Sequence, residues 1–299
     1  MSVTVRVPAK VNVQLAVGAA RPDGFHDLAN VFLAVSLYDE VTATPAGELR
    51  VTCEGPDADQ VPLDRTNLAA RAALALAERY GRAPDVHLHI AKDIPVAGGM
   101  AGGSADCAGA LVACDALWGT GASREELLEI CAELGSDVPF SLVGGAALGT
   151  GRGERLTELE VGGDFHWVFA LASRGLSTPA VFREFDRLGQ GLDIPEPVAD
   201  QAVLDALAKG DATALAVTVS NDLQPAALSL FPELGDTLAA GRAAGALAAL
   251  VSGSGPTTAF LATDAKSASD IAGVLRASGT CRDVRTASGP AAGATVLGS

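Results

Sequence analysis

A glycine-dense stretch with the sequence Pro-Val-Ala-Gly-Gly-Met-Ala-Gly-Gly-Ser-Ala occupies residues 95–105. Its four glycines carry no side-chain bulk and tolerate positive φ, so a phosphate could approach the backbone N–H groups closely. Ser104 stands at the expected N-cap of a helix whose apolar repeat includes Leu111 and Leu117. The free N–H groups and the positive dipole end of such a helix form an anion site. The stretch therefore predicts a nucleotide phosphate site formed by Pro95, Val96, Ala97, Gly98, Gly99, Met100, Ala101, Gly102, Gly103, Ser104 and Ala105.

Two common phosphate-binding glycine motifs do not describe this stretch. Gly98 and Gly103 have the spacing of a Walker A loop, but Ser104 stands where that loop requires a lysine. Residues 98–103 also do not match the dinucleotide-binding pattern Gly-x-Gly-x-x-Gly. The alternative is a tight strand-to-helix turn without a ligand, although such a turn needs one or two glycines rather than four.

Lys10 and Asp137 are charged residues whose local sequence restricts the backbone. Lys10 follows Pro8 and Ala9 inside an alternating segment, and Asp137 lies between a glycine turn and an apolar run that contains Pro139. A carboxylate and an ammonium group are suited to proton transfer and to the stabilisation of negative charge. Each residue also has an ordinary explanation. Lys10 could be an exposed lysine on an edge strand, and Asp137 could be a carboxylate that caps a helix or turn.

The segment at residues 21–26, Arg-Pro-Asp-Gly-Phe-His, is a turn by composition. Phe25 follows the turn directly, where its ring could stack on a nucleobase or plug the hydrophobic core. His87 and His89 share one face of a predicted strand. Because no third ligand lies near them in the sequence, a solvated face is favoured over a metal site.

The composition limits the class of protein. The chain has 299 residues, 48% hydrophobic residues and a formal net charge of -15, which argue for a globular protein with a large core. The negative charge excludes nonspecific binding to nucleic acid or to an anionic membrane. With no signal peptide and no long apolar run, and with five scattered cysteines, we expect a cytoplasmic protein with reduced thiols.

Periodicity predicts a mixture of strands and helices in both halves of the chain. In the first half, strands are expected at residues 3–7, 11–15, 31–44, 48–53 and 86–90, and helices at 67–80, 105–118 and 123–133. Pro8 is expected to interrupt the first strand. In the second half, strands are expected at 165–172, 246–251, 257–262 and 281–287, and helices at 179–188, 198–217, 232–244 and 265–277. The glycine-rich residues 144–153 are expected to form a hairpin or linker between two α+β domains.

Three segments resemble motifs of the GHMP kinase superfamily in their order and spacing. They are Pro8-Ala-Lys-Val-Asn12, the glycine-dense stretch, and Val251-Ser-Gly-Ser-Gly-Pro256. The resemblance implies an α+β fold of two domains, with ATP as the phosphoryl donor. Residues 1–155 would form the N-terminal nucleotide-binding domain, and residues 156–299 a ferredoxin-like C-terminal domain.

Residues 8–15, 21–26 and 135–140 are similar to the members of this superfamily that act on a cytidyl substrate. The resemblance implies phosphorylation of the 2-hydroxyl of a cytidyl-diphosphate-linked methylerythritol in the non-mevalonate isoprenoid route. Asp137 would be the general base, and Lys10 would orient the reacting groups and offset negative charge. The remaining implied roles are substrate binding by Asn12, Phe25, His26 and Phe182, and Mg²⁺ binding with Ser104 as a candidate ligand.

Asp106 falls in the expected first turn of the helix, where an acid would repel phosphate unless Mg²⁺ or a cap partner intervened.

Two other functions remain open: a different small-molecule GHMP kinase of the homoserine or mevalonate type, and a catalytically silent binding paralogue. The aromatic turn argues against the first, and the presence of both Lys10 and Asp137 argues against the second. The expected partners are ATP and a small cytidyl substrate, without nucleic acid or membrane, in a monomer or weak homodimer.

Overall fold

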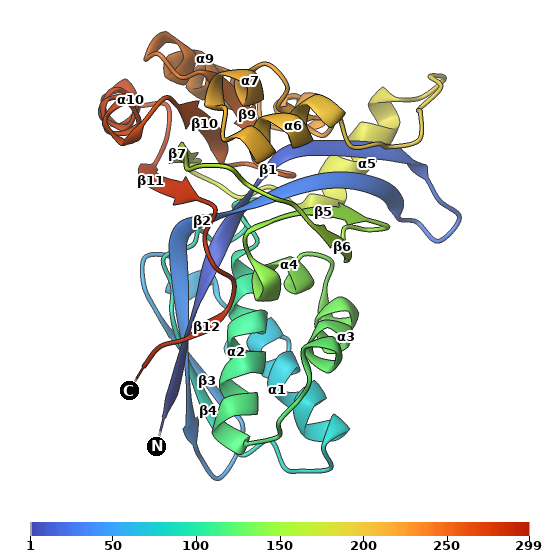
Figure 1. Cartoon of the computed structure of the whole chain (residues 1–299), viewed down its shortest axis with the longest axis vertical. Helices are drawn as coiled ribbons and strands as arrows, with labels where there is room; N and C mark the ends of the chain where they lie inside the picture. The colour runs from blue at the N-terminus through green and yellow to red at the C-terminus, as the bar shows by residue number, and fades with distance from the viewer. Residues whose placement is uncertain (1, 299) are drawn as a thin grey trace.

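The computed structural model describes residues 2–298, which form two β-sheets covered by helices (Figure 1). The eight-stranded sheet has the central order β12 (Thr295–Val296), β1 (Val3–Ala20), β2 (His26–Pro45), β4 (Val86–Ala91), β3 (Arg50–Glu54). It is completed by β5 (Ala146–Thr150) on β2, β6 (Arg155–Glu158) on β5, and β8 (Ser220–Asn221) on β1. The four-stranded sheet has the order β11 (Asp283–Gly289), β7 (Phe165–Leu171), β10 (Thr258–Ala262), β9 (Ala248–Val251).

The long hairpin of β1 and β2 extends from the lower part of the molecule to the upper part in Figure 1. The predicted interruption at Pro8 is wrong, because β1 is a single strand from Val3 to Ala20. A shift in the pairing with β2 between Pro8 and Ala9 accommodates the proline, which has no N–H to donate. Residues 7–13 of β1 are buried on both faces. Lys10 is therefore held in the interior of the protein.

Helices of the first half cover one face of the larger sheet. They are α1 (Leu68–Arg79), α2 (Gly102–Trp118), α3 (Arg124–Leu134) and the short α4 (Val138–Val143), and a 3₁₀ turn, η1 (Ala58–Gln60), follows β3. Gly109 lets α2 approach the sheet closely, since a Cβ there would lie 2.9 Å from methyl groups of Val7 and Val41. The close contact fixes the start of α2, and with it the glycine-dense stretch, relative to β1 and β2.

The second half has the β-α-β-β-α-β order and the antiparallel sheet of a ferredoxin-like fold. Its helices are α5 (Thr178–Leu188), α6 (Gln201–Lys209), α7 (Ala212–Ala216), α8 (Gln224–Leu230), α9 (Leu234–Ala243) and α10 (Ala265–Ser278). In Figure 1, α5 lies beside the upper ends of β1 and β2. Val181 of α5 packs there with Leu15 and Val17 of β1 in one buried cluster.

The α+β class predicted from the sequence is confirmed, with helix and strand limits that agree within a few residues for most elements. The proposed division into residues 1–155 and 156–299 falls at the first residue of β6, which pairs with β5 of the larger sheet. Strands β8 and β12 from the second half also pair with β1. The division of the chain into domains at this point therefore remains a proposal.

Candidate active site

A cavity of about 640 Å³ lies where the glycine-dense stretch, β1, the turn between β1 and β2, and α5 come together. Six residues singled out from the sequence line it, and they are Lys10, Asn12, Phe25, His26, Asp137 and Phe182. Eight residues of the glycine-dense stretch line it as well, and they are Pro95, Ala97, Gly98, Gly99, Ala101, Gly102, Gly103 and Ser104. The cavity thus joins the predicted phosphate site to the predicted base platform.

Three residues of the glycine-dense stretch do not line this cavity. The side chains of Met100 and Ala105 are fully buried in the core. Val96 lines a second, smaller cavity together with Asp57 and Arg282. Met100 nevertheless helps to hold the stretch in place, because its carbonyl accepts a hydrogen bond from the N–H of Lys10 at 3.3 Å.

The backbone of the stretch uses alanines as well as glycine for its left-handed conformations. Ala97, Gly99 and Ala101 have φ values of 52°, 75° and 61°. Two other glycines lie where space is limited: a Cβ at Gly98 would lie 3.0 Å from Thr257 Oγ1, and one at Gly102 would lie 2.9 Å from Lys92 Nζ. Close packing therefore accounts for Gly98 and Gly102, whereas a Cβ at Gly103 would make an ordinary contact, 3.5 Å from Leu68.

The predicted N-cap at Ser104 is wrong, because the N-cap position is Ala101 and α2 begins at Gly102, three residues earlier than expected. The left-handed conformation of Ala101 turns the chain into the helix, and no side chain caps this end. The first helical hydrogen bond runs from the N–H of Ala105 to the carbonyl of Ala101 at 2.8 Å. The N–H groups of Gly102, Gly103 and Ser104 therefore precede that bond at the start of a 17-residue helix. These N–H groups suit the anion site that the sequence predicted about one helical turn later in the chain.

Lys10 connects the glycine-dense stretch to the acid at position 137. Its side chain is 6% exposed, and Nζ donates to Asn12 Oδ1 at 2.6 Å and to the carbonyl of Gly99 at 3.1 Å. The alternative of an exposed edge-strand lysine is therefore wrong. Burial lowers the pKa of Lys10, and the nearby carboxylate of Asp137 opposes that shift.

Asp137 is at the N-cap position of α4, yet its side chain makes no capping hydrogen bond. Pro139 in the first turn of α4 fixes the backbone there. The carboxylate is about one-third exposed to the cavity, and its Oδ2 lies 3.7 Å from Lys10 Nζ. A carboxylate placed in this way is free to accept a proton from a hydroxyl group bound in the cavity.

Asn12 and Asn30 form a buried polar row with Lys10 on β1 and β2. Asn12 is 1% exposed, accepts from Lys10 through Oδ1 and donates through Nδ2 to Asn30 Oδ1 at 2.6 Å. From the second half, the glycine turn at 252–255 packs against this row, and a Cβ at Gly253 would lie 3.1 Å from Asn12 Oδ1. Ser252 Oγ donates to the carbonyl of Gly99 at 3.1 Å. Both glycine loops therefore hold the site from opposite halves of the chain.

Aromatic residues line the other end of the cavity. The ring of Phe25 is 48% exposed, and the guanidinium carbon of Arg152 lies 5.0 Å from its centroid. His26 is buried, and its Nε2 lies 2.8 Å from Asp186 Oδ1, a hydrogen bond that orients the imidazole. The rings of His26 and Phe182 are 5.0 Å apart. The exposed Phe25 ring is thus available for stacking at one wall of the cavity.

Three polar residues that line the cavity, Asn30, Arg152 and Asp186, were not singled out from the sequence. Asn30 could not be paired with Asn12 without the register of β1 and β2. Asp186 is four residues after Phe182 on α5, a spacing that places both side chains on one helix face and could have indicated it. Arg152 stands between Gly151 and Gly153 in the hairpin, and nothing in the sequence connects it to Phe25.

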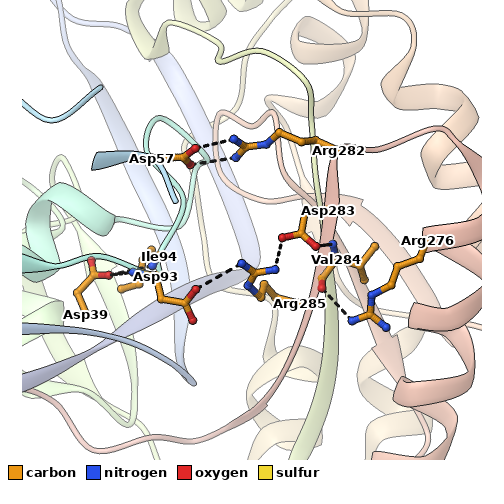
Figure 2. Close-up of polar contacts among 9 residues, drawn as sticks. All are labelled: Asp39, Asp57, Asp93, Ile94, Arg276, Arg282, Asp283, Val284 and Arg285. Atoms are coloured by element: carbon orange, nitrogen blue, oxygen red, sulfur yellow. Dashed lines mark hydrogen bonds and ion pairs between the residues drawn. The ribbon is translucent and has the colours of Figure 1, made fainter. Parts of the chain in front are cut away.

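Two ion pairs join the smaller sheet to the segments that border the glycine-dense stretch (Figure 2). Arg282 forms a two-pronged pair with Asp57, with nitrogen–oxygen distances of 2.5 Å and 2.9 Å. The guanidinium of Arg282 lowers the pKa of Asp57. Arg285 Nη2 lies 3.4 Å from Asp93 Oδ1, two residues before Pro95. The Arg285 pair fixes β11 against the start of the loop, and the Arg282 pair fixes the residue before β11 against the segment between β3 and η1.

Asp106 does not line the cavity, and it does not cap α2. It is 3% exposed, and its Oδ2 lies 2.9 Å from Lys92 Nζ. Burial raises the pKa of its carboxyl to about 8, against the opposing effect of Lys92. The carboxyl therefore turns away from the anion site rather than opposing a phosphate there.

The described residues contain no group of three or more histidine, cysteine or acidic side chains able to hold a metal ion. His87 Nε2 and His89 Nδ1 instead lie 2.7 Å and 2.9 Å from Thr52 Oγ1. Mg²⁺ needs no such group when phosphate oxygens and waters supply most of its ligands. The hydroxyl of Ser104 and the carboxylate of Asp137 in the same cavity fit an ion held mainly by a triphosphate.

None of the helices in the described part of the chain has the length and apolar character needed to cross a bilayer.

The comparisons with known proteins agree with this geometry. The families described as GHMP kinases N terminal domain and GHMP kinases C terminal match residues 67–145 and 203–281. A crystal structure of 4-(cytidine 5'-diphospho)-2C-methyl-D-erythritol kinase is similar, with a TM-score of 0.77 and 33% identity over 95% of this chain and 98% of that one. A homoserine kinase from Cytophaga hutchinsonii, 20% identical over 99% of this chain and 97% of that one, shares the fold with a TM-score of 0.74.

Two curated relatives match over nearly their whole length. The 4-diphosphocytidyl-2-C-methyl-D-erythritol kinase of Streptomyces coelicolor is 93% identical over 99% of this chain and 100% of its own. The kinase of the same name from Thermobifida fusca is 63% identical over 99% of this chain and 98% of its own. This chain therefore belongs to the 4-diphosphocytidyl-2-C-methyl-D-erythritol kinase family of the GHMP kinases.

Proposed function

We propose that this protein transfers the γ-phosphoryl group of ATP to the 2-hydroxyl of 4-diphosphocytidyl-2-C-methyl-D-erythritol, a step of the non-mevalonate route to isoprenoid precursors. The observation that carries the proposal is the meeting of Lys10, Asp137 and the glycine-dense stretch at one cavity, with Lys10 Nζ 3.7 Å from the acid and 3.1 Å from the carbonyl of Gly99. Phosphoryl transfer depends mainly on alignment and on charge stabilisation, and these groups supply both.

In the proposed reaction, Asp137 accepts the proton of the substrate hydroxyl as its oxygen attacks the γ-phosphorus. The new bond forms between that oxygen and phosphorus, the bond to the bridging β–γ oxygen breaks, and ADP leaves. Lys10 orients Asp137 and the substrate hydroxyl and offsets the negative charge that develops on the transferred group. The N–H groups of Gly102, Gly103 and Ser104 hold phosphate oxygens at the start of α2.

Mg²⁺ would neutralise charge on the β- and γ-phosphates when it is bound, and the hydroxyl of Ser104 is our candidate for a protein ligand. The acidic side chains near the glycine-dense stretch leave few cations for the triphosphate, since Lys92 is already paired with Asp39 and Asp106. A metal ion is therefore the expected source of the missing positive charge.

At the other end of the cavity, we propose that the cytidyl group stacks on Phe25 and is bounded by His26 and Phe182. The exposed ring of Phe25 supports stacking, and the hydrogen bond between His26 and Asp186 presents a fixed imidazole edge to a base. Asn12 would bind the methylerythritol unit beside Lys10. Asn12 lines the cavity, and its hydrogen bond to Lys10 also orients the ammonium group there.

A coupled assay of ADP release tests the function. The wild-type protein with ATP, Mg²⁺ and the cytidyl substrate should turn over, whereas Asp137→Asn should be nearly inactive. Homoserine and mevalonate in place of the cytidyl substrate should give no turnover. Activity with either of these alcohols would support another GHMP kinase, and no ADP release with any alcohol would support a silent paralogue.

We also propose that the protein works in the cytoplasm as a monomer or weak homodimer, without binding nucleic acid or membrane. The net charge of -15 supports the absence of a polyanionic partner. Light scattering after size-exclusion chromatography, at several protein concentrations, tests the oligomeric state.

A further inference from the structure

Three buried ionisable side chains meet behind the glycine-dense stretch, outside the cavity. They come from three elements: Asp39 from β2, Lys92 from the residue after β4, and Asp106 from the first turns of α2. Asp39 is fully buried, Lys92 is 4% exposed and Asp106 is 3% exposed. The ammonium group of Lys92 contacts Oδ2 of Asp39 and, at 2.9 Å, Oδ2 of Asp106. We call these three residues the charge cluster.

The charge cluster joins the two ends of the glycine-dense stretch. Asp39 Oδ1 accepts hydrogen bonds from the N–H groups of Asp93 at 2.7 Å and Ile94 at 2.8 Å, just before the stretch (Figure 2). Asp106 lies just after it, in α2. Lys92 bridges the two acids, so the side chains tie the segment that enters the loop to the helix that leaves it.

The ammonium group also lies directly beneath the anion site. A Cβ on Gly102 would come within 2.9 Å of Lys92 Nζ, so the first residue of α2 rests on the ammonium group. Asp106 Oδ1 is buried and has no hydrogen-bond partner. The contact with Lys92 is made by the other carboxyl oxygen, Oδ2, and the neighbouring Asp39 carboxyl helps to raise the pKa of Asp106. Burial of a carboxyl oxygen without a hydrogen-bond partner costs free energy. The presence of Asp106 is explained if its contact with Lys92 is needed.

We propose that Asp106 is a positioning residue that, together with Asp39, holds the Lys92 ammonium beneath Gly102 and so presets the loop amides for the triphosphate of ATP. The inference rests on the proposed function, because it assumes that ATP phosphates bind at the start of α2. It also accounts for an acid near an anion site: Asp106 acts on the loop through Lys92 and makes no contact with the nucleotide. Preset amides lose less conformational freedom when the ligand binds.

Asp106→Ala and Asp106→Asn test the proposal, with Asp115→Ala as the matched control. Asp115 lies at the other end of α2, where its Oδ1 accepts from Thr120 Oγ1 at 2.5 Å and from the N–H of Ala122 at 3.0 Å. We expect Asp106→Ala to raise the KM for ATP about tenfold or more, with little change in the KM for the cytidyl substrate. Asp106→Asn keeps an oxygen for Lys92 and should restore the KM for ATP to within about threefold of wild type. Asp115→Ala should lower thermal stability without raising the KM for ATP.

Two results would overturn the inference: an unchanged KM for ATP in Asp106→Ala, or an equal rise in both Michaelis constants. An inactive wild-type protein would instead overturn the proposed function. If Asp106→Ala is recovered in poor yield, Asp106→Ser takes its place. The readout is then the rise in melting temperature produced by a nonhydrolysable ATP analogue, which should be smaller than in Asp115→Ala at the same analogue concentration. An equal rise in the two variants would also overturn the inference.

Discussion

Lys10 Nζ lies 3.7 Å from Asp137 Oδ2, although one residue belongs to the first strand and the other to the start of α4. The two residues differ in burial, because the Lys10 side chain is 6% exposed and that of Asp137 is 32% exposed. The lysine is therefore fixed by the interior, while the acid faces the cavity. This difference in burial supports our proposal that Asp137 accepts the proton and Lys10 stabilises charge.

Replacement of Asp137 by asparagine should lower kcat by about 10²- to 10⁴-fold, the usual contribution of a general base. The KM for ATP should stay within about threefold, because the amide groups that hold the phosphates are unchanged. Steady-state kinetics with both substrates varied measure this. Turnover within about tenfold of wild type would show that another group accepts the proton.

Replacement of Phe25 by alanine should weaken binding of the cytidyl substrate by about 1 to 3 kcal/mol, the typical value of stacking on a base. Phe25→Tyr keeps the ring and should remain close to wild type. Isothermal titration with CDP measures the affinity without turnover. If Phe25→Ala binds CDP as tightly as wild type, the ring does not stack on the base.

Arg152 should contribute through its contact with the Phe25 ring, 5.0 Å from guanidinium carbon to centroid. A partly exposed cation–π contact is worth about 0.5 to 1 kcal/mol, so Arg152→Ala should raise the KM for the cytidyl substrate by about two- to fivefold. Arg155→Ala is the control, because the Arg155 side chain is 79% exposed and its Nε lies 3.8 Å from Glu154 Oε1. Equal effects of the two replacements would exclude a specific role for Arg152.

The burial of Lys10 predicts an alkaline limit of activity. Its pKa is lowered from the ordinary value of 10.5, so the ammonium group loses its charge as the pH rises toward that value. The pH profile of kcat should accordingly decline below pH 10.5. Circular dichroism over the same range checks that the protein remains folded. A flat profile up to the ordinary lysine pKa would contradict a requirement for the charged form.

The ion pair between Asp57 and Arg282 should stabilise the packing of the two halves of the chain. Asp57→Asn is expected to lower the free energy of unfolding by about 1 to 2 kcal/mol at pH 7. This range allows for the partial exposure of Arg282, because solvent weakens the ion pair. Arg282 lowers the pKa of Asp57 in the folded protein below 3.8, its ordinary value in the unfolded chain. The stabilisation is therefore fully present at pH values above 3.8, and it is lost as the pH falls through the lower pKa of the folded protein. Urea unfolding at pH 7 and near pH 3 measures both effects. A difference that persists unchanged at acid pH would exclude the ion pair as its cause.

Much of the fold could be predicted from periodicity. The helix predicted at residues 123–133 is α3, Arg124–Leu134, and Ser123 and Glu126 form a complete capping box at its start. The prediction failed at Pro8, because a bulge in the pairing with β2 lets the strand continue past a residue without an N–H. It also failed at Ser104, because the left-handed turn at Ala101 starts α2 without a side-chain cap. Both errors concern local backbone adjustments that neighbouring strands and loops impose.

The sequence by itself determined the residue types of the site, since Lys10, Asp137, Phe25 and the glycine-dense stretch are recognisable from local chemistry and from family motifs. It also determined the α+β class, because apolar periodicity follows from which faces are buried. The tertiary structure decided which of these residues meet, because the distance between Lys10 and Asp137 depends on the packing of α4 against β1. It also decided the partners of Lys92, since the pairing of a buried ammonium with Asp39 and Asp106 is a property of three elements packed together, and no one segment encodes it.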